Sequence, residues 1–206
     1  MQREIRFAGR VLIAGTIMLM IGAMSAVYFR QTPPTDPLQQ LRLIAGDPIG
    51  WTAQAILFPI AMAIIAIGFG LAGARLPAGL AQRLGIAAAC LAVIACLLWI
   101  PISVARIQLG SAAAGMLETT AANDPQLNIS GNTFWPYTVA ALLSIALMGM
   151  ALALGGRLRK MGWVLAVLAL VCLGVVVPLW RDWPPFMSYL FTLAMAIGLM
   201  RFRDQS

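Results

Sequence analysis

Six runs of nearly unbroken apolar residues constrain this chain more than any other feature. The runs cover residues 9–29, 52–74, 84–103, 136–156, 161–179 and 185–200. Each approaches the ~20 residues that an α-helix needs to cross the ~30 Å hydrocarbon core of a bilayer. Only helices and closed barrels satisfy their backbone hydrogen bonds in lipid. Because the runs show no alternation of polar and apolar residues, they are predicted to be helices.

Composition supports lipid as the solvent. Of the 206 residues, 61% are apolar and only 10% are charged, whereas soluble domains carry about 25% charged residues. The sequence therefore predicts an all-α integral membrane protein with a single domain, residues 1–206. We expect a compact bundle of six transmembrane helices. The loops on its outer side are predicted to be residues 30–51, 104–135 and 180–184. In the second of these, residues 105–120 are rich in alanine and lack proline, so they can continue the third helix beyond the membrane.

The basic residues predict the orientation of the bundle. With the N-terminus inside, ten basic residues fall in inner segments: Arg3, Arg6, Arg10, Arg75, Arg83, Arg157, Arg159, Lys160, Arg201 and Arg203. Four fall in outer segments: Arg30, Arg42, Arg106 and Arg181. This asymmetry follows the positive-inside rule, so both termini are predicted to be cytoplasmic, with a bacterial plasma membrane as the default location. The ten inner basic residues are spread over four segments without interleaved aromatics, which argues against a nucleic-acid partner.

The first outer loop contains the signals of a short helix. Asp36 suits an N-cap, Pro37 the first helical position and Gly46 a stop. One face would carry Leu38, Leu41 and Ala45. We expect an amphipathic helix on the outer membrane surface, with a plain loop as the alternative.

The spans also suggest helical hairpins. The third and fifth runs both extend from a glycine to a proline over sixteen positions, Gly85 to Pro101 and Gly162 to Pro178. Each even-numbered span follows a tryptophan and ends in an inner arginine. The pattern admits three helical hairpins that each cross out and back. Tryptophans and arginines at these levels also occur in unrelated multispan proteins, so duplication remains open.

Small residues four positions apart predict where helices approach closely, either within the bundle or with a partner. Candidate packing positions are Gly22, Ala66, Gly70, Ala74, Ala92 and Gly155. The glycine-rich end of the second span, around Gly70, is the strongest of them. Pro59 lies inside the same span and is expected to kink it.

Several kinds of chemistry are missing from the sequence. The chain has no histidine, which excludes histidine-based metal and haem sites and a Ser-His triad. No charged residue lies in the middle third of any span, where one would mark an ion or proton pathway. The three cysteines fall inside spans, away from the outer loops. The sequence therefore predicts no catalytic residue, no metal site and no cofactor.

Polar chemistry gathers instead on the outer side. The candidate ligand-binding residues are Gln54, Arg106, Glu118, Trp135, Arg181, Asp182 and Trp183. An arginine at an aromatic-lined mouth suits an anionic headgroup or a carboxylate. One alternative is that the arginines extend to lipid phosphates without a dedicated ligand. Another is that Gln54 forms a hydrogen bond between helices.

Two hypotheses of function follow. The first is a structural, assembly or modulatory membrane component without catalytic apparatus, whose partners would be the bilayer and other membrane subunits or further copies of the chain. The second is a transporter or binding protein for a small solute or lipid, with an outward-facing polar and aromatic mouth. An intramembrane enzyme using Glu118 and Asp182 is a third, but no paired acids or nucleophile-base spacing support it.

Overall fold

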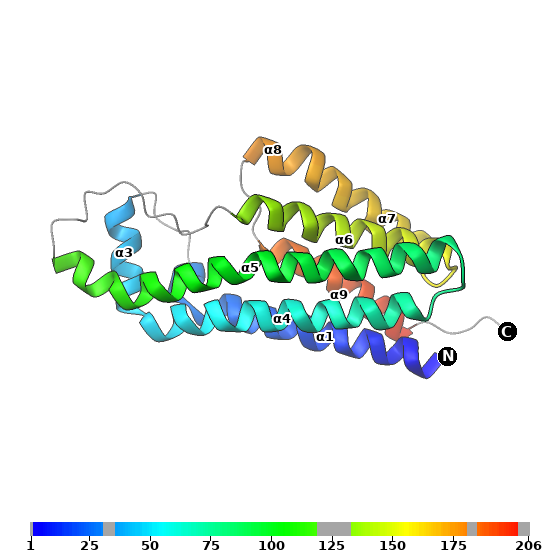
Figure 1. Cartoon of the computed structure of the whole chain (residues 1–206), viewed down its shortest axis with the longest axis horizontal. Coiled ribbons are helices and arrows are strands. Elements are labelled where there is room, and N and C mark those ends of the chain that lie inside the picture. Colours follow the sequence, from blue (N-terminus) through cyan, green and yellow to red (C-terminus); the bar gives the residue numbers. More distant parts are fainter. Residues whose placement is uncertain (1, 31–35, 119–132, 181–184, 202–206) are drawn as a thin grey trace.

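The structure, a computed structural model, describes residues 2–30, 36–118, 133–180 and 185–201. Every regular element in these segments is a helix (Figure 1). The long ones are α1 (Gln2–Ser25), α4 (Pro48–Ala74), α5 (Leu80–Glu118) and α6 (Phe134–Leu154). The others are α2 (Val27–Arg30), α3 (Pro37–Gly46), α7 (Arg159–Val171), a π-helical turn (Cys172–Val176), α8 (Val177–Trp180) and α9 (Pro185–Arg201).

Five helical segments are long and apolar enough to cross a membrane: α1, α4, α5, α6 and the continuous segment Arg159–Leu179. This agrees with the predicted helical membrane bundle. α9 has 17 residues, which is close to the lower limit of ~17 for a spanning helix. Its described apolar part, Leu190–Arg201, is shorter than the other five.

The helices pack mainly on their neighbours in the chain. α1 packs on α4, α4 on α5, α5 on α6 and α6 on α7. α9 then packs along α1, so the first and last helices lie side by side (Figure 1). The third predicted hairpin is therefore not a packed pair, because α9 contacts α7 only lightly. Gly9 allows α9 to approach α1 closely, since a Cβ there would lie 3.0 Å from the backbone oxygen of Ala196.

The two ends of the bundle differ in charge. The start of α1, the end of α9 and the short α4–α5 and α6–α7 connections lie at one end, which we call the basic end (Figure 1). The other, called the α3 end, carries α3 across the side of α5. The described basic residues at the basic end are Arg3, Arg6, Arg10, Arg75, Arg83, Arg157, Arg159, Lys160 and Arg201.

α5 is much longer than the third apolar run. Its 39 residues extend about 58 Å, about twice the thickness of the hydrocarbon core. Part of the predicted loop 104–135 is thus helical up to Glu118, and α6 begins at Phe134. The predicted loop 30–51 likewise contains α2, α3 and the start of α4. In the predicted loop 180–184, residues 181–184 lie outside the described part of the chain.

α3 confirms the predicted short helix. The Asp36 carboxylate accepts hydrogen bonds from the backbone N–H groups of Leu38 and Gln39. The buried face differs from the predicted one, because Leu41 and Ile44 are fully buried while Leu38 and Ala45 are only partly buried. Leu41 and Ile44 pack in a cluster with Trp51, Ala113 and Tyr28. The apolar face of α3 is therefore covered by protein, chiefly by the extension of α5.

Asp47 joins three elements at the α3 end. It caps α4 by accepting from Gly50 N at 3.0 Å, and it also accepts from Val27 N at 2.7 Å. Replacing Asp47 with alanine removes the cap and leaves the part-buried Val27 N–H without its partner. We expect a loss of about 2–3 kcal/mol in the free energy of unfolding.

This loss can be measured by denaturant unfolding in detergent, followed by tryptophan fluorescence. The matched control is Asp36→Ala, which removes an exposed cap and should cost about 1 kcal/mol or less. Equal losses for the two variants would contradict the junction role of Asp47.

Glycines allow the closest approaches between helices. A Cβ on Gly73 would lie 2.7 Å from the backbone carbon of Gly85, and a Cβ on Gly149 would lie 2.7 Å from the oxygen of Gly162. Near the basic end, the backbone of α4 thus contacts that of α5, and the backbone of α6 contacts that of α7. Each connection also contains a glycine with positive φ, Gly79 and Gly156. This conformation strains residues that carry a Cβ.

The predicted packing positions fit this arrangement unevenly. Gly22 packs on Phe58, Gly155 approaches Leu76, and Ala66 and Ala92 are buried. Gly70 makes no tight contact within the described chain, because a Cβ there would meet only Ala89 at 4.0 Å. Ala74 is exposed. For these two positions, a contact with a partner helix stays a prediction. On α4 the tight contacts are instead made by Gly68 and Gly73, which face α1 and α5.

The prolines inside α4 and α5 do not end their helices. α4 continues through Pro59 and α5 through Pro101. Near Pro178 the helix widens into the π-helical turn Cys172–Val176. A proline ring clashes with the carbonyl four residues earlier in an α-helix, here that of Gly174. A wider turn at this position gives the ring room.

Candidate functional site: a buried arginine with polar neighbours

One arginine is buried at the α3 end. Arg106 is only 6% exposed, although arginine is almost never buried without compensation. The centre of its guanidinium lies 5.2 Å from the ring of Phe29, 5.7 Å from Trp51 and 5.2 Å from Trp99. Such cation–π contacts contribute about 0.5–2 kcal/mol each. The aromatic rings therefore offset part of the cost of burying this charge.

The surrounding aromatic side chains hold one another in place. The indole N–H of Trp51 donates to the backbone oxygen of Arg106 at 2.6 Å. Phe29 stacks on Trp51 with ring centroids 5.7 Å apart, and Tyr28 meets Trp51 edge-on at 5.3 Å. Residues of α2 and α4 thus surround Arg106 of α5. The hydrogen bond from Trp51 fixes how α4 and α5 are aligned along their axes at this point.

The pairing of α4 with α5 brings two further polar residues together. The helices are antiparallel, with Trp51 in contact with Arg106 and Phe58 in contact with Trp99 at 5.5 Å. Both contacts are seven residues apart on each helix, which corresponds to two helical turns. Gln54 and Ser103 each lie three residues from the Trp51–Arg106 contact. This register places Gln54 opposite Ser103.

Gln54 is fully buried, and neither its amide oxygen nor its amide nitrogen has a hydrogen-bond partner among the described residues. The same holds for the indole N–H of Trp99 and the hydroxyl of Ser103. Each buried polar group without a partner costs about 1–3 kcal/mol. Such groups are rare in native proteins and call for an explanation, such as a bound water or ligand. Here they cluster beside a buried arginine.

A small, mostly apolar cavity lies beyond the cluster in the middle of the bundle. Tyr137 packs edge-on against Trp99 at 4.5 Å and lines this cavity of about 50 Å³. Ser144, Ser188 and Thr192 also line it, but the other eight lining residues are apolar. None of Gln54, Trp99, Ser103 and Arg106 lines the cavity.

The predicted ligand-binding residues separate into three groups. Gln54 and Arg106 lie together in the buried cluster described above. Glu118 is exposed at the end of α5, about 18 Å along the helix from Arg106, and Trp135 is an exposed side chain on α6. Arg181, Asp182 and Trp183 lie outside the described residues.

Trp99 and Ser103 were not among the predicted ligand-binding residues. The signal that identifies them is helical spacing: residues 99, 103 and 106 share one face of α5, and residues 51, 54 and 58 share one face of α4. The sequence does not say that these two faces meet. That information comes from the register of the α4–α5 pair.

The cluster is rich in hydrogen-bond donors. The Arg106 guanidinium, the Trp99 indole, the Ser103 hydroxyl and the Gln54 amide can all donate, so the site suits a negatively charged oxygen. Within the described residues, no group of three or more His, Cys, Asp or Glu side chains could hold a metal ion. No protein-family model, curated protein or solved structure matches this chain, so its function is argued from the residues alone.

Proposed function

We propose that this chain is a plasma-membrane protein of six spans, with α9 as the sixth and with both termini in the cytoplasm. The positive-inside asymmetry supports this orientation, because the basic residues concentrate at one end of the bundle. The α3 end then faces outwards. The 17-residue α9 packs along α1, which supports α9 as a short sixth span.

We further propose that the protein binds a small solute bearing a carboxylate, which enters from the α3 end. The observation that carries this function is the fully buried Gln54 amide, which has no partner among the described residues. A carboxylate would receive a charge-assisted hydrogen bond from Arg106. It would also accept from the Gln54 amide, Trp99 and Ser103.

A structural or assembly role is the second candidate. It is favoured by the open side of α4, where Gly70 is only half-buried and Ala74 is exposed. Small residues left uncovered on a helix surface let another membrane helix approach closely. In that case the partner would be another membrane subunit or a second copy of the chain. Neither candidate involves catalysis.

Carboxylate binding can be tested by thermal unfolding of the full-length protein in detergent. The probes are hexanoate and benzoate, each compared with the amide of the same skeleton. A carboxylate at about 100 times its dissociation constant stabilises by about 2.7 kcal/mol, which raises Tm by about 5–10 °C for a chain of this size. We expect at least one carboxylate to raise Tm and both amides to leave it unchanged.

The matched variants are Arg106→Gln and Arg42→Gln. Both remove one positive charge from the α3 end, but Arg42 is exposed on α3. Arg106→Gln should abolish the shift, and Arg42→Gln should preserve it. A panel without any carboxylate-specific shift, or loss of the shift in both variants, would contradict the proposed function.

A further inference from the structure

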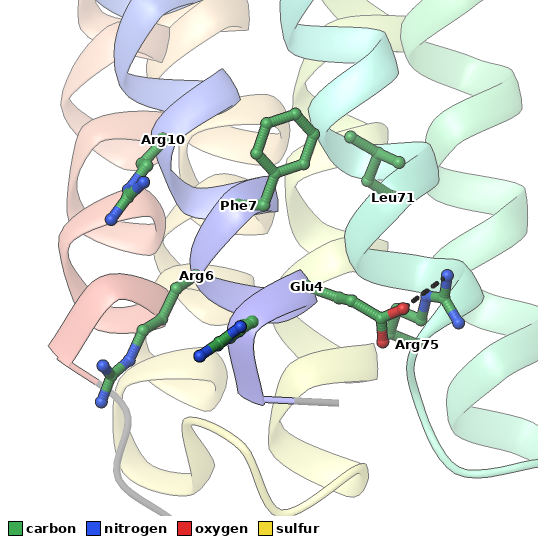
Figure 2. Close-up of a pocket in the computed structure, with 7 residues that line it drawn as sticks. Glu4, Arg6, Phe7, Arg10, Leu71 and Arg75 are labelled. Atoms are coloured by element: carbon green, nitrogen blue, oxygen red, sulfur yellow. Dashed lines mark ion pairs between the residues drawn. The ribbon is translucent and has the colours of Figure 1, made fainter.

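A second polar region lies at the basic end, far from Arg106. A groove of about 630 Å³ opens between α1 and α4 (Figure 2). Four arginines line it: Arg3, Arg6, Arg10 and Arg75. Three of them come from the first helical turns of α1, and the fourth follows the last residue of α4. The proposed carboxylate site uses none of these residues.

The charges in this groove are not balanced. Glu4 is its one acidic lining residue, and the carboxylate pairs with Arg75 across the α1–α4 gap at 3.0 Å (Figure 2). Four positive charges against one negative charge leave the lining at +3. Arg3, Arg6 and Arg10 form no ion pair with any residue that the structure describes.

Arg6 and Arg10 lie one helical turn apart on α1, and Figure 2 shows both side chains extending to the same side of the helix. The Nε atom of Arg6 is buried and has no hydrogen-bond partner in the described part of the chain. A guanidinium in this position retains donors for an external acceptor. Two guanidinium groups that extend side by side suit the oxygen atoms of a phosphate.

The wall of the groove between α1 and α4 is apolar. Phe7 is 55% exposed, and Leu71 on α4 is partly buried. Figure 2 shows both between these two helices, whereas Arg6 and Arg10 extend to the other side of α1. The groove therefore combines a cationic side with an apolar wall. An amphiphile with an anionic head has the complementary arrangement, whereas a free inorganic anion would leave the apolar wall uncovered.

We propose that this groove is a binding site for an anionic phospholipid of the leaflet at the basic end. The phosphate lies among Arg3, Arg6 and Arg10, and an acyl chain runs along Phe7 and Leu71. Basic pockets between transmembrane helices recognise phospholipid headgroups in this way. The Glu4–Arg75 ion pair closes the side of the groove towards α4 and leaves the three α1 arginines to the lipid.

The proposal is tested by native mass spectrometry of the full-length protein in a non-ionic detergent, titrated with phosphatidylglycerol and phosphatidylcholine of identical acyl chains. We expect one phosphatidylglycerol to bind at least about tenfold more tightly than phosphatidylcholine. The triple variant Arg3→Gln/Arg6→Gln/Arg10→Gln should weaken phosphatidylglycerol binding about 100-fold. Arg6→Gln alone should weaken it about fivefold, which keeps the test available if the triple variant does not fold.

The matched control is Arg83→Gln/Arg159→Gln/Lys160→Gln. It removes the same charge from the same end of the bundle, at exposed residues that do not line the groove. It should change the affinity for phosphatidylglycerol less than about threefold. Equal binding of the two lipids, or an equal loss in both triple variants, would overturn the proposal. Displacement of the lipid by millimolar inorganic phosphate would also overturn it, because a free anion would then be the occupant.

Discussion

Replacing Gln54 with leucine is expected to stabilise the ligand-free protein while abolishing carboxylate binding. The Gln54 side chain is fully buried, and both its polar atoms lack partners in the described segments. An apolar side chain of similar volume avoids the desolvation cost of about 1–3 kcal/mol for each such atom. We therefore expect a gain of about 2 kcal/mol or more in the free energy of unfolding. The same substitution removes a donor that a bound carboxylate needs.

These opposite effects separate a binding residue from a structural one. Unfolding in detergent gives the stability, and the carboxylate-induced rise in Tm gives the binding. Gln108→Leu is the matched control, because Gln108 lies exposed on the α5 extension and its replacement should change neither measurement. If Gln54→Leu lowered the stability of ligand-free protein, the amide would have an internal partner and the case for a ligand would fail.

The second large effect is expected at the contact between α4 and α5. A Cβ on Gly73 would meet the backbone of Gly85 at 2.7 Å. Backbone atoms cannot rotate away, so Gly73→Ala must push the two helices apart. We expect a loss of about 3 kcal/mol or more in the free energy of unfolding, at the upper end of overpacking effects. Gly85→Ala should have a similar effect, because it meets the same contact from the other helix.

Gly70→Ala provides the control on the same helix. Its Cβ would meet only Ala89, at 4.0 Å, so there is room for a methyl group. Alanine also favours the helix over glycine by about 1 kcal/mol, and the variant should be at least as stable as the natural protein. Thermal unfolding of the detergent-solubilised proteins measures both changes. A tolerated Gly73→Ala would show that the helices do not pack in this register.

Local chemistry allowed much of the fold to be predicted. The apolar runs identified the long helices, and Asp36 with Pro37 identified α3, because capping and proline geometry act over a few residues. The alanine-rich, proline-free residues 105–120 also indicated that the third helix continues beyond the membrane, and α5 does continue up to Glu118. The place of α9 was less accessible, because α9 packs on α1 from the opposite end of the chain. That packing depends on contacts between segments distant in sequence.

The packing glycines and the residues of the site also depend partly on local sequence and partly on contacts between distant segments. Glycine spacing on the second span drew attention to Gly70, but the side of α4 that faces α5 is set by tertiary structure, and it contains Gly73. Gln54 could be selected because a large amide inside an apolar span is costly, and Arg106 because an arginine at an aromatic-lined mouth suits an anion. Trp99 and Ser103 joined them only once the register of the two helices was known.

The most direct test of a ligand in the buried cluster is the intact mass of the protein, purified in mild detergent from its own host and measured under native conditions. We predict a single chain, or copies of it, carrying a small organic acid that is absent from Gln54→Leu. Association with unlike subunits, without any small-molecule adduct, would contradict the binding function and identify the chain as a component of a larger membrane assembly.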